Sequence, residues 1–418
     1  MTQLKSTSLT LLLLILCALA YPAVAQDQLA ALTGDGSVIL HSPTGEELVS
    51  LNPNRSLVPA SIVKIPLAQA ALTTLGEDFR FETDFYRNES GDLLIRGLGD
   101  AFLVSEEIAR IATILAERGT GPIRRLVMDD SAFEPQPDLP VEPGADDPYA
   151  ARNSALAVNF NTVNLAWTAQ GELVSGEEQT PLTPLARELG ARFVTRELSS
   201  AQIASGARAS REPQRINLGD DPINGLRQVQ QLFQAFLEQA GITVTDADFY
   251  REAVSDEWTL FYRHPSSRSL RENLEGMLRY SNNFIANQLF LTLGAQNGGY
   301  PVTTSAARAA LQQQLAQLYG DGFGQDPQSL LMLEGSGLSR EQRVSAAGMM
   351  HILDVFKPYA NLLPETNGVL RKSGTLTGVY NFAGYIRGAD GLYPFVILTN
   401  QASNNRAEIL RILQRRVQ

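Results

Sequence analysis

The chain has 418 residues, of which 44% are hydrophobic and 19% are charged, enough apolar material for one large globular domain or roughly two or three smaller ones. Its formal net charge of −11 argues against binding nucleic acid or anionic lipid through bulk charge. Its one cysteine, Cys17, lies in an N-terminal apolar run that we expect to be removed. The mature protein would then have no thiol, which excludes disulfides, cysteine-ligated zinc and thiol catalysis.

Residues 1–25 have the pattern of a secretory signal. Lys5 supplies a positive start, residues 9–20 are apolar, and Ala23-Val24-Ala25 is a small-x-small cleavage site. Tyr21-Pro22 ends the apolar run well short of the ~20 residues that span a bilayer. We therefore expect cleavage, export to the periplasm or the exterior, and no transmembrane anchor in the mature protein.

The first elements of the mature chain are predicted as a β-hairpin followed by a helix. Strand-like runs at Ser37–His41 and Glu47–Leu51 flank the turn Pro43-Thr44-Gly45. The segment Ala60–Leu75 has helical spacing of its apolar residues and ends at Gly76.

From about residue 79 to residue 254 the texture is mixed, with Pro/Gly/Asp-rich loops between short elements. The sequence predicts strands at Asp92–Arg96 and Ala155–Phe160 and helices at Glu106–Arg118 and Pro222–Gln239. Because we expect the elements after this region to belong to the same domain as those before it, we interpret the region as an insertion into that domain.

The remaining elements predict an α+β architecture, in which an antiparallel sheet is flanked by helices with a helical lobe in front. The predicted elements are a helical block at Leu270–Leu293, strands at Val369–Ser373, Phe382–Arg387 and Leu392–Leu398, and a helix at Ala407–Val417. We therefore expect a main domain made of residues 26–78 and 256–418, interrupted by residues 79–255 as one or two smaller domains.

Lysine is rare in this chain, which directs attention to the few positions that keep it. The four lysines are Lys5, Lys64, Lys357 and Lys372, and arginine supplies all other basic residues. A lysine can become a neutral amine at accessible pH, whereas an arginine effectively cannot. The lysines are therefore the first candidates for chemistry.

Ser61-Ile62-Val63-Lys64 stands at the start of the predicted helix. On a helix, positions three residues apart share a face, so the Ser61 hydroxyl and the Lys64 amine should lie together. Lys64 could take the Ser61 proton if burial or a second cation such as Lys372 lowered its pKa. The alternative is structural, with Ser61 near a helix cap and Lys64 as a solvated charge.

Two further motifs follow in the chain. Ser281-Asn282-Asn283 lies at a predicted helix junction, where such residues are ordinary caps, and Lys372-Ser373-Gly374-Thr375 lies on a strand, where it could be an edge lysine beside a bulge. Each motif alone is weak, but the three occur in order and use two of the three mature lysines. Together they predict one active site.

This set resembles the active-site motifs of serine penicillin-binding proteins and serine β-lactamases. Several phrases are similar to the class C low-molecular-mass group, the D-alanyl-D-alanine carboxypeptidase/endopeptidases. They are Gly97-Leu98-Gly99-Asp100, Val127-Met128-Asp129-Asp130-Ser131-Ala132-Phe133, Ser154-Ala155-Leu156-Ala157-Val158-Asn159 and Gly335-Ser336-Gly337-Leu338-Ser339-Arg340. The likeness covers nearly all of the mature chain, including the insertion. Glu334 and Ser373 depart from the commoner Asp and Thr of the family and keep the same chemical groups.

The resemblance implies a transpeptidase-like fold, no cofactor, and peptidoglycan stem peptides and β-lactams as partners. It implies that Ser61 attacks the carbonyl of the penultimate D-Ala, that Lys64 is the base and that Ser281 relays a proton to the leaving amine. The remaining roles are substrate binding: Asn283 at the substrate amide, Lys372 and Thr375 at the terminal carboxylate, Gly374 beside them, and the N–H groups of Ser61 and Thr375 at the oxyanion.

The resemblance also suggests a pocket for the stem-peptide side chain, framed by Asp129, Phe133 and Arg340. A carboxylate and a guanidinium could pair separately with the ammonium and carboxylate of diaminopimelate. The alternative is that Asp129 caps a turn, Phe133 belongs to the core and Arg340 forms a surface ion pair.

Three rival functions stay open at this point. A β-lactamase-like hydrolase would differ in how fast its acyl-enzyme is released, and a non-catalytic peptidoglycan-binding homologue would normally have lost Ser61 or Lys64. A Ser-His-Asp hydrolase could use His41, His264 or His351, but no Gly-x-Ser-x-Gly elbow accompanies them.

Overall fold

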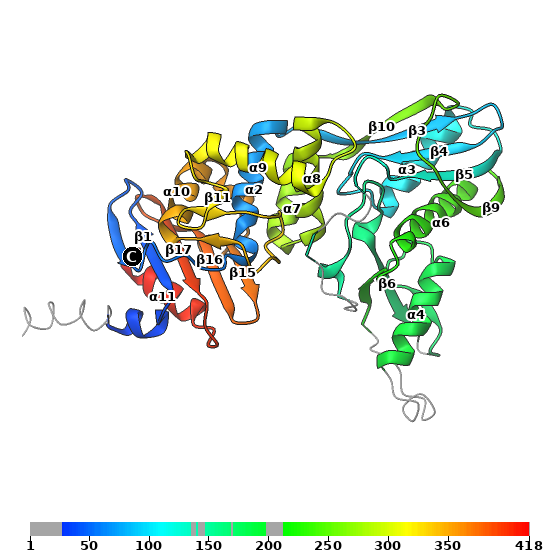
Figure 1. The fold of residues 1–418 in the computed structure, drawn as a ribbon. Helices are drawn as coiled ribbons and strands as arrows, with labels where there is room; N and C mark the ends of the chain where they lie inside the picture. Colours follow the sequence, from blue (N-terminus) through cyan, green and yellow to red (C-terminus); the bar gives the residue numbers. More distant parts are fainter. Residues whose placement is uncertain (1–26, 135–138, 141–146, 169, 198–211, 418) are drawn as a thin grey trace, which may run out of the picture. The chain divides into compact units, whose positions relative to one another are not determined.

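The computed structural model describes residues 27–134, 139–140, 147–168, 170–197 and 212–417. The expected signal sequence and Cys17 lie outside these residues. The chain divides into two compact units (Figure 1), each described here by itself. Unit 1 comprises Met1–Pro66, Leu315–Leu333 and Gly337–Gln418, and unit 2 comprises Leu67–Gln314 and Glu334–Ser336. No helix in the described ranges is both long and apolar enough to cross a bilayer.

Unit 1 is built on a six-stranded antiparallel sheet with the order β14-β15-β16-β17-β1-β2. Its strands are β1 (Ser37–His41), β2 (Glu47–Leu51), β14 (Glu365–Thr366), β15 (Val369–Leu376), β16 (Val379–Gly388) and β17 (Gly391–Thr399). The predicted hairpin is confirmed as β1 and β2. Figure 1 shows β1 beside β17, so the start and the end of the chain share one sheet.

Helices cover both faces of this sheet. Alternate residues of β1 and β17, such as Val38 and Phe395, pack with Ile409 and Leu413 of α11 (Arg406–Val417) in an apolar core. On α10 (Ala346–Phe356), the Leu353 carbonyl accepts a hydrogen bond at 2.5 Å from the buried Tyr385 hydroxyl of β16. The remaining short elements of unit 1 are η4 (Lys357–Leu362) and the sheet of β11 (Gln325–Asp326), β12 (Leu330–Leu331) and β13 (Arg343–Val344).

The predicted helix Ala60–Leu75 is confirmed in extent, but it begins as a 3₁₀ turn. This turn is η1 (Ala60–Val63), and α2 continues it from Lys64 to Leu75. Ala60 has a φ of 50°, so the chain enters the turn through a left-handed residue directly before Ser61.

Unit 2 contains a five-stranded mixed sheet with the order β10-β3-β4-β5-β9. Its strands are β3 (Arg80–Arg87), β4 (Leu93–Gly97), β5 (Ile123–Asp129), β9 (Val244–Arg251) and β10 (Thr259–Ser269), of which the β4-β5 and β5-β9 pairs are parallel. Helices α3 (Ser105–Glu117) and α6 (Ile223–Gln239) share one apolar core with this sheet. These helices confirm the two predicted for the insertion.

A smaller sheet, β7-β6-β8, packs with α4 (Pro184–Glu197) in a separate core. Its strands are β6 (Thr162–Trp167), β7 (Leu173–Ser175) and β8 (Gln214–Asn217), and η2 (Pro148–Ala150) and η3 (Asn159–Asn161) are nearby elements in sequence. The predicted strand Ala155–Phe160 is wrong. Asn159, Phe160 and Asn161 all have φ near 50–60°, and the Asn159 amide oxygen accepts from the Ser105 N–H at 3.0 Å, so this segment curls back instead of extending.

The predicted helical block Leu270–Leu293 is two helices, α7 (Leu270–Tyr280) and α8 (Asn283–Gly298). The break occurs because Ser281 is left-handed, with φ 55°, and caps α7. The Asn282 side chain then accepts from the Ile285 N–H at 2.9 Å and starts α8. Helix α9 (Thr304–Tyr319) follows and runs into the start of the second segment of unit 1.

Candidate active site

Ser61 and Lys64 are in direct contact in unit 1. The Lys64 Nζ donates to Ser61 Oγ at 3.0 Å, and Lys64 is fully buried. This contact follows from the three-residue spacing, because η1 and the first turn of α2 place both side chains on one face. An amine at hydrogen-bond distance from a hydroxyl is the geometry of a base beside its nucleophile.

The backbone before Ser61 is fixed to the sheet by two buried or half-buried amides. The Asn381 Nδ2 of β16 donates to the carbonyl oxygens of Val58 and Pro59, each at 2.9 Å, and Asn381 has no exposed surface. The Asn400 Oδ1 accepts from the Val58 N–H at 2.7 Å. These contacts determine where Ser61 lies, and no local pattern in the sequence predicts them.

Two glycines also contact this segment from motifs far along the chain. A Cβ built on Gly374 of β15 would lie 2.5 Å from the Pro59 carbonyl oxygen. A Cβ on Gly337 would lie 2.3 Å from the Ala60 carbonyl oxygen and 2.8 Å from the Ser61 nitrogen. Such distances require glycine, so both motifs pack their backbones against the segment that carries Ser61.

Lys372 lies on β15 and is 1% exposed. Its Nζ donates to the Ser373 carbonyl oxygen at 2.9 Å. Burial, with a smaller contribution from the positive charge of Arg406, lowers the pKa of Lys372 to about 7. An anion bound beside Lys372 would favour its charged form, which makes this position suited to a carboxylate.

Thr375 stands three residues further along β15 and is exposed. Its Oγ1 accepts a hydrogen bond at 2.7 Å from Nη1 of Arg406, the first residue of α11. Arg406 was not predicted as a site residue. It is separated by more than thirty positions from the lysine motif, and chain spacing carries no signal of the contact.

In unit 2, Ser281 and Asn283 occupy the junction of α7 and α8, where the sequence predicted a helix junction. Ser281 caps α7 through its N–H to the Met277 carbonyl oxygen. The Asn283 Nδ2 donates to the Tyr149 carbonyl oxygen at 3.2 Å. The motif therefore owes its position to the left-handed break between two helices.

The Glu334 phrase is fixed in the same unit. The buried Glu334 carboxylate accepts from the Ser336 N–H at 2.6 Å and from the Ser336 hydroxyl at 2.5 Å. The Gly335 N–H donates to the Asn287 Oδ1 of α8 at 2.9 Å. Glutamate thus serves as the acceptor at the position where the family phrase has aspartate.

The three residues suggested for the stem-peptide side chain have different surroundings. In unit 2, Asp129 is 1% exposed and accepts from the N–H groups of Ser131 at 2.8 Å and Val254 at 3.0 Å, and Phe133 is equally buried. Both line a cavity of about 520 Å³. In unit 1, Arg340 is exposed and donates to the Thr377 carbonyl oxygen at 2.9 Å. Because Asp129 and Phe133 are buried, they have a structural role, whereas the exposed side chain of Arg340 can contact a ligand in solution.

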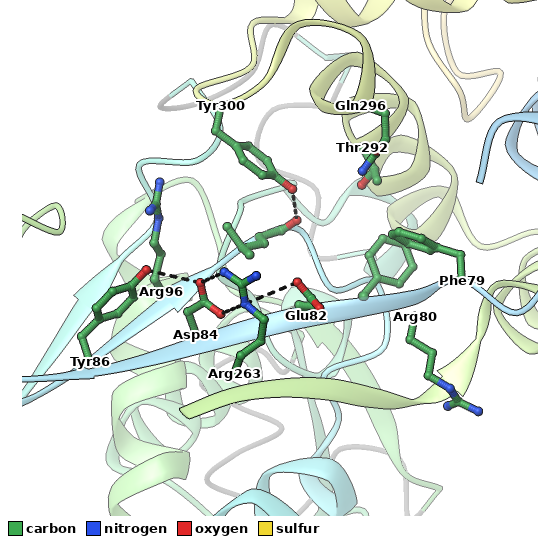
Figure 2. Close-up of a pocket in the computed structure, with 12 residues that line it drawn as sticks. Phe79, Arg80, Glu82, Asp84, Tyr86, Arg96, Arg263, Thr292, Gln296 and Tyr300 are labelled. Atoms are coloured by element: carbon green, nitrogen blue, oxygen red, sulfur yellow. Dashed lines mark hydrogen bonds and ion pairs between the residues drawn. The ribbon is translucent and has the colours of Figure 1, made fainter. Parts of the chain in front are cut away.

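A second cavity of unit 2, about 440 Å³, is lined mainly by β3, α8 and Arg263 of β10. Figure 2 shows Asp84 and Arg263 facing each other across the two strands, with Tyr300 on the opposite side. Arg263 donates to both oxygens of the buried Asp84, at 2.7 and 2.8 Å. These hydrogen bonds outweigh the effect of burial and raise the pKa of Arg263. The main charges of this cavity therefore neutralise each other, and none of the predicted site residues lines it.

The histidine of unit 2 does not form a Ser-His-acid relay. The Glu107 carboxylate lies between the other two groups, 2.7 Å from His264 Nε2 and 2.5 Å from the Ser267 hydroxyl that donates to it. Burial by itself would raise the pKa of Glu107, but the hydrogen bonds from His264 and Ser267 outweigh it and lower the pKa to about 2. Because the serine contacts the acid and not the imidazole, this cluster is arranged as a structural network.

Comparison with known proteins shows the family of this chain. A family model described as the D-Ala-D-Ala carboxypeptidase 3 (S13) family matches residues 22–363. A D-alanyl-D-alanine carboxypeptidase of Actinomadura sp. (strain R39) is 28% identical, and the alignment covers 90% of this chain and 80% of that protein. The D-alanyl-D-alanine carboxypeptidase DacB of Haemophilus influenzae is 24% identical over 82% of this chain and 80% of its own length.

Solved structures show the same fold. The crystal structure of penicillin binding protein 4 (dacB) from Haemophilus influenzae superposes with a TM-score of 0.71 at 20% identity, covering 93% of this chain and 98% of that one. A predatory endopeptidase of Bdellovibrio bacteriovorus superposes with a TM-score of 0.51 at 15% identity, covering 91% of both chains. The predicted α+β fold of the penicillin-binding type is thereby confirmed.

Proposed function

The chain belongs to the D-Ala-D-Ala carboxypeptidase 3 (S13) family, and from that membership we propose how its own residues carry the reaction. It is a low-molecular-mass penicillin-binding protein and a serine-type D-Ala-D-Ala carboxypeptidase. The observation that carries the assignment of residues is the 3.0 Å contact between Lys64 Nζ and Ser61 Oγ.

In the first step, Ser61 Oγ attacks the carbonyl carbon of the penultimate D-Ala while Lys64 takes the hydroxyl proton. The carbonyl oxygen becomes an oxyanion, which the N–H groups of Ser61 and Thr375 stabilise. The C–N bond then breaks, and the terminal D-Ala leaves with a proton relayed through Ser281. Water hydrolyses the ester on Ser61 and restores the enzyme.

Substrate binding is assigned to the other motif residues. Lys372 and Thr375 receive the carboxylate of the leaving residue at the edge of β15, and Gly374 keeps that strand close to the nucleophile segment. Asn283 binds the substrate amide. In the same reaction a β-lactam acylates Ser61 and is retained as an inhibitor.

The setting of the enzyme is likewise proposed from sequence and family. Residues 1–25 direct export, so the enzyme acts in the periplasm or outside the cell on peptidoglycan stem peptides, as a carboxypeptidase or an endopeptidase. Residues 79–255 form the accessory insertion within a peptidase domain made of residues 26–78 and 256–418.

The test is covalent labelling followed by mapping. Incubation with benzylpenicillin should add one penicilloyl group, and peptide mass spectrometry should place it on Ser61. Release of D-alanine from a diacylated Lys-D-Ala-D-Ala peptide measures turnover by the same residue. An adduct on Ser281 or Ser336, or no adduct on a folded protein, would contradict the assignment.

Arg340 is proposed to pair with the side-chain carboxylate of diaminopimelate, with Asp129 and Phe133 shaping the cavity of unit 2. Arg340→Ala should lower kcat/KM on a diaminopimelate-containing pentapeptide by roughly 10- to 150-fold, which corresponds to the ~1.5–3 kcal/mol of a hydrogen bond to a charged group. The same variant should hydrolyse a simple diacylated D-Ala-D-Ala at the wild-type rate. Equal losses on both substrates would return Arg340 to a structural role.

A further inference from the structure

Arg406 lies against the strand that carries the lysine motif. Its Nη1 donates to Thr375 Oγ1 at 2.7 Å and to the Gly374 carbonyl oxygen at 3.2 Å. Its guanidinium stacks over the Phe382 ring, with 4.6 Å from Cζ to the ring centroid. Three contacts from one half-buried side chain fix the guanidinium beside residues 374–375.

The hydrogen bond from Arg406 determines what the Thr375 hydroxyl can do. A guanidinium has only donors, so Thr375 Oγ1 must be the acceptor in this pair. The single proton of the hydroxyl then points away from Arg406 and can be donated to another group. Because Thr375 is exposed, that group can be a ligand.

No described strand extends the sheet beside Thr375 on the outer side of β15. Its outer neighbour, β14, pairs only with Val369 and Leu370, and among the described strands none pairs with the outer edge beyond them. A ligand can therefore approach the Thr375 hydroxyl along the strand.

The positive charges at this edge favour binding of an anion. Side chains alternate between the two faces of a strand, so Lys372 lies on one face of β15 and Thr375 on the other. Arg406 bonds to Thr375, so the cations Lys372 and Arg406 lie on different faces of the strand. Within the described residues, Arg406 lies within 4.0 Å of no carboxylate, and burial together with Arg371 lowers the pKa of Arg406. A negative charge bound at the edge of the strand, near both cations, would be stabilised by each of them.

We propose that Arg406 is a positioning residue that makes the enzyme selective for acyl donors with a carboxylate next to the scissile bond. It does so by orienting the Thr375 hydroxyl as a donor and by adding a second positive charge beside Lys372. This inference rests on the proposed function, in which Lys372 and Thr375 receive that carboxylate.

The test compares an anionic and a neutral acylating agent of one scaffold. The second-order rate constant of acylation is measured with benzylpenicillin and with its uncharged methyl ester, for wild type, Arg406→Gln and Arg406→Lys. Arg406→Gln should slow acylation by benzylpenicillin about tenfold, the worth of one charge-assisted hydrogen bond, and change the ester rate less than about twofold. Arg406→Lys keeps the charge and should recover part of the loss.

Arg371→Gln is the matched control. Arg371 is also partly buried and stacks on the same Phe382 ring at 4.9 Å, but it makes no hydrogen bond to Gly374 or Thr375 among those of the described residues. The acylation rate constant of Arg371→Gln with each agent should stay within about twofold of the wild-type value. A similar slowing with both agents in Arg406→Gln, or none with either, would overturn the inference.

The outcomes separate this inference from the proposed function. If wild type is not acylated on Ser61, the proposed function fails whatever Arg406 does. If wild type is acylated and prefers the anionic agent, and a folded Arg406→Gln keeps that preference, only the inference about Arg406 fails. Thermal unfolding of each variant establishes that it is folded.

Discussion

Replacing Lys64 by arginine is expected to slow acylation of Ser61 by roughly 10²–10⁴-fold, the usual contribution of a general base. Lys64 Nζ lies 3.0 Å from the Ser61 hydroxyl, so it is placed to take the proton. An arginine would keep a positive charge at this position but cannot accept a proton near neutral pH. Stopped-flow measurement with a fluorescent penicillin gives the rate constant.

Two further variants make this result interpretable. Lys64 is fully buried, so the larger guanidinium would also disturb packing. Lys64→Gln, a neutral side chain one atom shorter, tests the loss of the amine without added bulk and should be equally inactive. Lys357→Arg changes a lysine of unit 1 whose Nζ donates to the Pro43 carbonyl oxygen at 3.1 Å, and it should acylate at the wild-type rate. Near wild-type acylation by a folded Lys64→Arg would show that another group is the base.

The local parts of this site could be predicted from the sequence. The spacing of Ser61 and Lys64 determines their contact on a helical turn, and the unbroken apolar runs in β1 and β17 indicate central strands that are buried on both faces. Each of these depends only on residues close together in the chain. The resemblance of three ordered motifs to one family then supplied the activity.

The tertiary contacts of the site could not be predicted in this way. Asn381 and Gly337 contact the segment before Ser61 from about three hundred residues away, and Arg406 contacts Thr375 from another element. An asparagine, an arginine or a glycine is unremarkable in its own neighbourhood. The same reason explains the wrong strand at Ala155–Phe160. Its apolar residues 155–158 are buried, and Leu156 and Val158 belong to the core, but the left-handed residues Asn159, Phe160 and Asn161 turn the chain.

Replacing Gly337 by alanine is expected to slow acylation about a hundredfold, because small displacements of a reacting group have effects of that size. A methyl group on Gly337 would meet the Ala60 carbonyl oxygen at 2.3 Å and the Ser61 nitrogen at 2.8 Å, both backbone atoms that side-chain rotation cannot move. Relief therefore requires a shift of the two backbone segments relative to each other, which displaces Ser61 from its place beside residue 337.

The control for this variant is Gly368→Ala. Gly337 and Gly368 both have left-handed φ, 89° and 72°, so alanine should cost each about 1–2 kcal/mol of stability. A Cβ on Gly368 meets nothing within 4 Å, so that variant isolates the backbone cost from the contact with Ser61. We expect Gly368→Ala to unfold at a somewhat lower temperature and to acylate at the wild-type rate, whereas Gly337→Ala loses both stability and rate. If the two variants acylated equally fast, the close approach of Gly337 would have no part in placing the nucleophile, and its conformation alone would account for the glycine.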